Sequence, residues 1–141
     1  MLILPPLLWR EIEDRTRRAL PDEACGLLLG SVRGNEIEVA ALASARNVAA
    51  DPHVDFELDP LDAVAAEDGA RASGWAIVGV WHSHPRGPSS PSLQDRSGAC
   101  AAWLTLIAVP KPRTGIQLGA WRCTEHGYAA VVVAESFSTH G

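Results

Sequence analysis

Two histidines at strand spacing are the residues of this sequence best suited to chemistry. His82 and His84 follow residues 75–81, a nearly continuous apolar run that predicts a buried strand. Alternate side chains of a strand point to the same face, so the two imidazoles share a face, with Cα atoms roughly 6.5 Å apart. Two ring nitrogens can converge on one metal ion from that separation, whereas Ser83 points the other way and is expected to be structural.

A carboxylate further along the chain is suited to be a third ligand. Residues 85–91 contain three prolines and a glycine, which predicts a rigid loop that reverses the chain, and residues 92–102 then predict a helix. Asp95 lies in the first turn of that helix, where the helix dipole favours a carboxylate. Two neutral histidines and one aspartate leave the fourth tetrahedral position open for water, the pattern of a catalytic zinc site. Zinc lowers the pKa of such a water to about 7.

Each part of this pattern also has a simpler explanation. A His-x-His pair on its own is usually accidental. The segment Ser92-Leu-Gln-Asp95 also matches an ordinary helix start, with Ser92 as the N-cap and Asp95 in the first turn. Capping and metal binding are compatible, since capping would fix both side chains. Taken singly, the residues leave metal binding open.

The combined spacing is more specific. The sequence has a His-Ser-His triplet that is followed by seven residues, a serine, two residues and an aspartate. This spacing resembles the motif of the JAMM metallopeptidases, also called the MPN+ or JAB family. The family motif also has a glutamate before a buried strand, and the segment Pro-Asp-Glu-Ala-Cys-Gly-Leu-Leu-Leu-Gly at 21–30 matches it with Glu23. Asn47 and the Phe-Glu-Leu-Asp-Pro stretch at 56–60 also resemble short bacterial members. The resemblance follows the order of the elements over nearly the whole chain.

The resemblance implies a role for every residue of the motif. It makes His82, His84 and Asp95 the ligands of one Zn²⁺ ion per chain. Glu23 becomes the general base that takes a proton from water and returns it to the leaving amine, and Ser92 becomes the donor to the developing oxyanion. The implied substrate is an amide or isopeptide bond at the C-terminus of a ubiquitin-like or sulfur-carrier protein, as in relatives that release cysteine from a sulfur-carrier adduct.

Two other classes of function stay open. A non-catalytic scaffold or binding module could use the same fold and hold zinc structurally, although no residue of the motif is missing here. The DNA-associated relatives of the bacterial RadC proteins also carry a His-x-His-Pro run followed by Pro-Ser-x-x-Asp. The net charge of −5 argues against phosphate-driven binding of nucleic acid, so we expect no nucleic-acid partner.

The cysteines and the apolar runs bear on the location of the protein. Cys25, Cys100 and Cys123 are odd in number and lack CxxC spacing, so we expect no disulfide framework and a cytoplasmic location. Cys25 shares a strand face with Glu23, yet a small residue in an apolar run is more often core packing than a nucleophile. The longest apolar run, 99–109, is too short to span a bilayer, so we expect no membrane contact. The oligomeric state cannot be predicted from these patterns.

The remaining pattern predicts the elements that must position these residues. Strands that first pair locally and then alternate with helices indicate one α/β domain over residues 1–141, a mixed sheet flanked by helices, with 134–141 as a frayed tail. The resemblance implies the JAB/MPN form of this fold, and Trp81, next to His82, is expected to line the cleft. The predicted helices span 7–19 and 61–73 besides 92–102, and the predicted strands span 24–30, 36–42, 54–58, 75–81, 104–109, 115–123 and 128–133.

Overall fold

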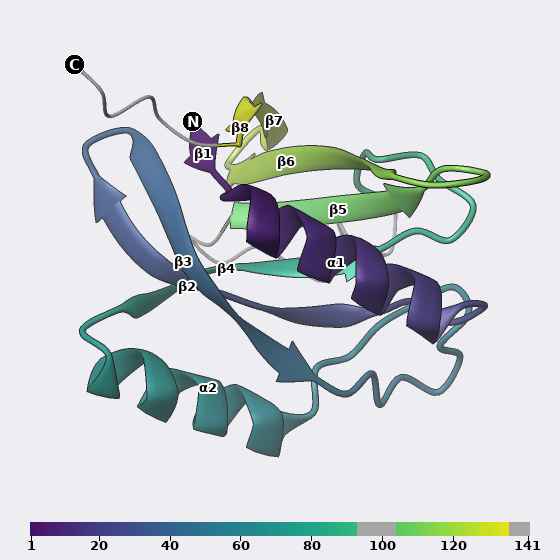
Figure 1. The fold of residues 1–141 in the computed structure, drawn as a ribbon, viewed down its shortest axis with the longest axis horizontal. Coiled ribbons are helices and arrows are strands. Elements are labelled where there is room, and N and C mark those ends of the chain that lie inside the picture. Colours follow the sequence, from purple (N-terminus) through teal and green to yellow (C-terminus); the bar gives the residue numbers. More distant parts are fainter. Residues whose placement is uncertain (93–103, 136–141) are drawn as a thin grey trace.

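Among the described residues, one mixed β-sheet with two helices packed on it forms the fold (Figure 1). The computed structural model describes residues 1–92 and 104–135. Helix α1 (Pro6–Ala19) packs against β5, and helix α2 (Pro60–Ala72) packs against β2, β3 and β4. The strands are β1 (Leu2–Ile3), β2 (Cys25–Arg33), β3 (Glu36–Ala45), β4 (Ala76–Ser83), β5 (Leu104–Pro110), β6 (Ile116–Thr124), β7 (Gly127–Val131) and β8 (Val133–Ala134).

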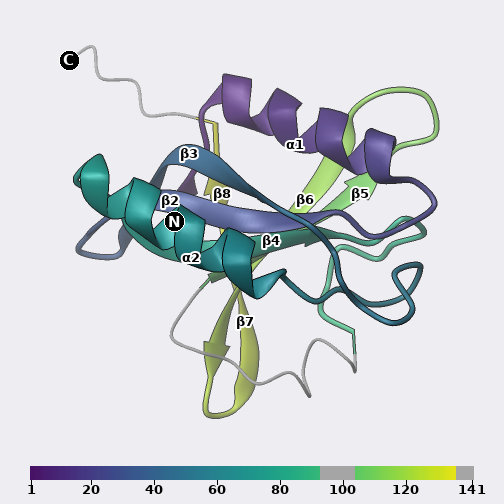
Figure 2. The same cartoon turned by 90° about the horizontal axis from the view of Figure 1, so that it is seen from below.

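The sheet order puts the histidine-bearing strand in the middle. The strands run in the order β7-β6-β5-β4-β2-β3-β1-β8, with β4 antiparallel to β2 and parallel to β5. The register pairs Cys25, at the start of β2, with His82, near the end of β4. The residues just before β2 and just after β4 therefore meet at the same end of these two neighbouring strands. The hairpin of β6 and β7 projects away from this region and from α1 (Figure 2).

The main apolar core lies between α1 and one face of the sheet. Ile12 of α1 packs in one cluster with Leu28 of β2 and Trp81 of β4. Trp81 is 1 % exposed, so the expectation that it lines a cleft is wrong. Strand alternation turns the Trp81 ring to the face opposite His82. Gly26 of β2 leaves the space that the ring needs, because an added Cβ would lie 2.5 Å from the indole Nε1.

The predicted fold class, an α/β mixed sheet flanked by helices, is confirmed, with corrections at two places. Residues 54–58 do not form a strand; they make a single bridge, between Asn47 and Leu58. The side chain of Asn47 binds backbone groups there that a strand partner would otherwise bind. Ala134, assigned to the frayed tail, lies in β8 beside β1, and its carbonyl accepts a hydrogen bond from Leu4. The predicted helix at 92–102 lies almost entirely outside the described residues.

The cysteines differ from one another. Cys25 is free and buried, whereas Cys123 is disulfide-bonded. The expectation of no disulfide framework is therefore wrong at Cys123, and the cytoplasmic location inferred from it stays a prediction without that support. No helix among the described residues is long and apolar enough to cross a membrane.

Candidate functional site

Three buried side chains meet where β2 begins and β4 ends. Glu23, His82 and His84 each contribute one potential ligand atom, and these atoms all lie within 4.8 Å of one another. Their exposed fractions are 6 %, 1 % and 7 %. The structure thus joins a carboxylate to the two histidines although almost sixty residues separate Glu23 from His82.

Hydrogen bonds between Ser83 and Ala24 hold the end of β4 next to the residues that precede β2. The Ser83 hydroxyl accepts a hydrogen bond from the Ala24 N–H (2.8 Å), and the Ser83 N–H donates to the Ala24 carbonyl (3.0 Å). Ser83 lies between the two histidines and is completely buried. It is therefore a structural residue, as the strand alternation predicts, and it fixes the chain next to Glu23.

The two imidazoles present nitrogen atoms to the same point. The Nε2 atoms of His82 and His84 are 3.2 Å apart, and the His84 Nδ1 lies 2.6 Å from the Pro88 carbonyl oxygen. A carbonyl only accepts hydrogen bonds, so Nδ1 of His84 carries a proton, and in the neutral imidazole Nε2 then keeps its lone pair. Two nitrogen ligands at 2.0–2.1 Å on a tetrahedral zinc ion lie about 3.3 Å apart, so this pair fits zinc without rearrangement. The same distance also suits a hydrogen bond donated by His82.

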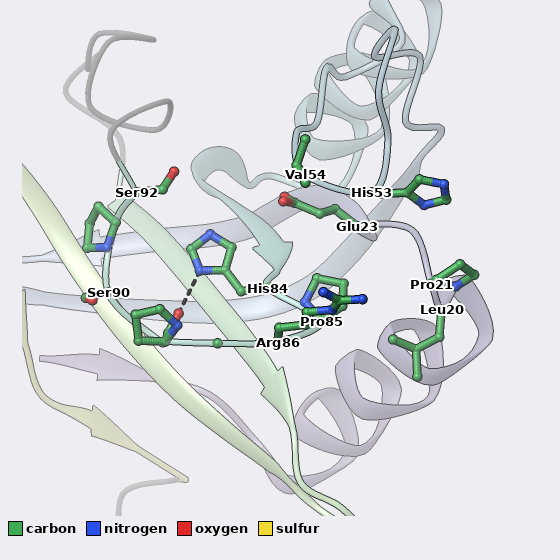
Figure 3. Close-up of a pocket in the computed structure, with 13 residues that line it drawn as sticks. Leu20, Pro21, Glu23, His53, Val54, His84, Pro85, Arg86, Ser90 and Ser92 are labelled. Carbon is green, nitrogen blue, oxygen red and sulfur yellow. Dashed lines mark hydrogen bonds between the residues drawn. The ribbon is translucent and has the colours of Figure 1, made fainter.

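Glu23 and His84 line an open pocket of about 690 Å³. In Figure 3 the Glu23 carboxylate points across the pocket toward His84 and Ser92, which lie on the opposite side. Ser92, predicted to support an oxyanion, is half-buried and lines the same pocket. Glu23, His84 and Ser92 therefore face a space that can admit a substrate.

The loop after β4 forms much of the pocket wall. Its first turn is closed by a hydrogen bond from the Gly87 N–H to the His84 carbonyl (3.0 Å). Its later part is held by the Trp121 indole N–H, which donates to the Ser89 carbonyl (2.8 Å). These contacts support the predicted rigidity of residues 85–91.

Two residues that contribute to the site, Phe56 and Pro88, were not predicted from the sequence. The Phe56 ring stacks on His82, with ring centroids 4.2 Å apart and planes inclined by 18°. The Pro88 carbonyl sets the tautomer of His84, as described above. The family-like stretch at 56–60 was a signal for Phe56, whereas no side-chain pattern could indicate a carbonyl contact. Asp95, the expected third ligand, lies outside the described residues.

Cys25 lies near the cluster but is not suited to nucleophilic attack. Burial, helped by the negative charges of Glu23 and Asp62, raises the pKa of its thiol to about 12. The thiolate is the nucleophilic form, and almost none is present at neutral pH. The sulfur lies 3.7 Å from the Ala45 carbonyl, to which it donates. Core packing is the role that fits these observations.

The family follows from a match over most of the chain. Residues 5–124 match the family model described as prokaryotic homologs of the JAB domain. The chain is a member of the prokaryotic JAB family. A solution structure of a protein from Desulfitobacterium hafniense has a similar fold: it is 28 % identical, with a TM-score of 0.85 over 99 % of this chain and 97 % of that one.

Two relatives of this JAB protein carry functional names. A desampylase of Haloferax volcanii is 37 % identical over 94 residues, 66 % of each chain. A protein of Thermus thermophilus named "probable TtuB-protein conjugate cleaving protease" is 30 % identical over 95 residues, 67 % of this chain and 61 % of the relative. The matched regions thus span slightly less than two thirds of these relatives' own lengths.

Proposed function

We propose that this JAB protein is a zinc-dependent hydrolase that cleaves amide or isopeptide bonds at the C-terminus of a ubiquitin-like or sulfur-carrier protein. The observation that carries the proposal is the pair of Nε2 atoms 3.2 Å apart, with the Glu23 carboxylate within 4.8 Å, beside an open pocket. The name of the Thermus relative describes cleavage of a protein conjugate, which supports the substrate class.

The chemistry of the donors suits zinc. His82 and His84 would hold the ion together with Asp95, and two imidazoles with one carboxylate leave one tetrahedral position open. When bound, zinc supplies Lewis acidity and lowers the pKa of water, which makes hydroxide available at neutral pH. Because His84 Nδ1 donates to a main-chain carbonyl, the neutral imidazole is held in the tautomer whose Nε2 can bind a metal ion.

The protein's own groups would move the protons. The Glu23 carboxylate takes a proton from the attacking water and delivers it to the nitrogen of the leaving amine. The Ser92 hydroxyl donates a hydrogen bond to the oxygen of the scissile carbonyl as negative charge develops there. Glu23 is also close enough to the histidines to be a ligand itself, and its substitution separates the two roles.

The test combines a metal analysis with a cleavage assay. Protein purified without added metal or chelator is expected to contain one zinc ion per chain by elemental analysis. Adducts of candidate carrier proteins are then incubated with it, and the released group is identified by mass spectrometry. A chelator should abolish release and added zinc should restore it.

The metal analysis and the cleavage assay test different parts of the proposal. Absence of zinc, with no recovery of chelator-treated activity by zinc, would refute the metal assignment. A protein that holds zinc and cleaves none of the adducts would be a scaffold or a binding module, and the proposed hydrolase activity would be wrong.

A further inference from the structure

Two side chains of the loop between β3 and α2 contact the candidate site in ways that the proposed chemistry does not use. Asn47 lies at the start of this loop, and Phe56 lies nine residues later. One binds the backbone of Glu23 and the other covers the ring of His82. The two contacts concern the base and a metal ligand, respectively.

Asn47 uses all the hydrogen-bonding capacity of its side chain. Its Nδ2 donates to the Glu23 carbonyl (2.9 Å) and to the Asp55 carbonyl (3.0 Å). Its Oδ1 accepts from the N–H groups of Ala49 (3.0 Å) and Glu57 (3.1 Å). An amide group has two hydrogens to donate and two lone pairs to accept, so the side chain is saturated.

The backbone of Glu23 depends on this loop. Its carbonyl accepts from Asn47, and its N–H donates to the Pro52 carbonyl (2.7 Å). Glu23 lies two residues before Cys25, the first residue of β2, so the sheet ladder does not bind the N–H or the carbonyl of Glu23. The loop thus replaces the missing strand partner on both sides of the residue.

Phe56 restricts His82 in a different way. Its ring lies nearly parallel to the imidazole, at a centroid distance of 4.2 Å, and is itself half-buried. The Phe56 N–H donates to the Asp55 side chain (2.8 Å), and the Asp55 carbonyl accepts from Asn47. The ring is therefore connected through Asp55 to the same side chain that binds Glu23.

We propose that Asn47 and Phe56 are positioning residues: Asn47 fixes the Glu23 backbone, and Phe56 fixes the plane of the His82 imidazole. This inference rests on the proposed zinc hydrolase function. A ligand whose ring can tilt binds metal less tightly, and a base displaced by a fraction of an ångström transfers protons less efficiently.

The two residues should therefore affect different measured quantities. Asn47→Asp keeps the shape and the acceptor oxygen but removes both N–H donors, so Glu23 loses a hydrogen bond. We expect kcat to fall about 10-fold while KM and zinc affinity stay near the wild-type values. Phe56→Leu removes the stacked ring, and we expect zinc affinity to fall about 10-fold. Phe56→Tyr keeps an aromatic ring at this position, so its zinc affinity should stay near the wild-type value.

The experiment measures zinc affinity by competition with a chromophoric chelator, the visible spectrum of the cobalt(II)-substituted protein, and kcat and KM on a cleavable adduct. Melting temperatures of the metal-free variants report on folding alone. Glu57→Ala is the control, because its exposed side chain lies in the same loop and only its main chain contacts Asn47. The cobalt spectrum should change in Phe56→Leu and not in Phe56→Tyr or Glu57→Ala.

Several outcomes would overturn the inference. One is wild-type kcat in Asn47→Asp together with wild-type zinc affinity and cobalt spectrum in Phe56→Leu. Another is a loss in both variants that only follows the melting temperature of the metal-free protein. If Asn47→Asp does not fold, the comparison of Phe56→Leu with Phe56→Tyr decides, because these two variants differ in whether an aromatic ring is present at position 56. A wild-type protein that binds no zinc would instead contradict the proposed function.

Discussion

The two sides of the candidate site are held in different ways. His82 lies in a central strand, where the ladders to β2 and β5 fix the main chain, and the N–H of His84, the next residue after that strand, donates to the Ala108 carbonyl of β5 (2.9 Å). Glu23 lies outside the ladder, and the side chain of Asn47 and the carbonyl of Pro52 fix it instead. The proposed metal-binding side thus follows from the sheet, whereas the proposed base, Glu23, depends on a few contacts from a loop. This difference predicts separable defects on the two sides.

The largest effect is expected on the strand side. His82→Ala removes a proposed ligand, so zinc should be lost and turnover should fall by at least about 10²-fold. Elemental analysis and the adduct assay measure the two losses. His126→Ala, an exposed histidine in a turn far along the chain, should keep both. Full zinc occupancy in His82→Ala would show that the histidine pair is not the metal site.

The loop side should lose catalysis and keep the metal. Glu23→Gln preserves shape but cannot accept a proton, so kcat is expected to fall about 10²–10⁴-fold with zinc content unchanged. Loss of zinc from this variant would make Glu23 a ligand and would remove the distinction between the two sides.

A third substitution tests the far wall of the pocket. Ser92→Ala should retain zinc and slow turnover about 10²-fold, because a donor to the oxyanion is removed. The effect should lie in kcat, with KM little changed. A rise in KM alone would assign Ser92 to substrate binding.

The contact that joins the two sides should affect stability. Ser83→Ala leaves the buried Ala24 N–H without the hydroxyl that accepts its hydrogen bond, and the free energy of unfolding should fall by about 1–3 kcal/mol. Urea denaturation measures this. Ser31→Ala, at the other end of β2, should change it much less, and equal losses would contradict a special role for Ser83.

The smallest effect is expected at Cys25. With a thiol pKa of about 12, the folded protein should resist iodoacetamide at pH 8, and Cys25→Ala should keep turnover within about 2-fold. Unfolding returns the pKa to the ordinary thiol range, so the unfolded chain releases this proton first as the pH rises. This residue's contribution to stability therefore declines above pH about 9. Rapid alkylation of the native protein at pH 8 would contradict the assignment.

The strand side of the site could be predicted from the sequence, and the loop side could not. An apolar run followed by His-Ser-His determines by strand alternation that His82 and His84 share a face. Glu23 could be assigned only by resemblance, because its approach depends on the pairing of β2 with β4, which no local pattern encodes. The predicted strand at 54–58 was wrong for a related reason. There Asn47, a single side chain, binds the backbone groups that a neighbouring strand would bind.

The hydrogen bond from His84 to Pro88 has a consequence for how this site tolerates change. Its acceptor is a main-chain oxygen, so replacing the side chain at position 88 does not delete it. The bond depends on the path of the loop, which the turn at Gly87 and the bond from Trp121 to Ser89 maintain. The site should therefore be sensitive to insertion or deletion between His84 and Ser89. The length and path of this loop preserve the proton on Nδ1 of the ring.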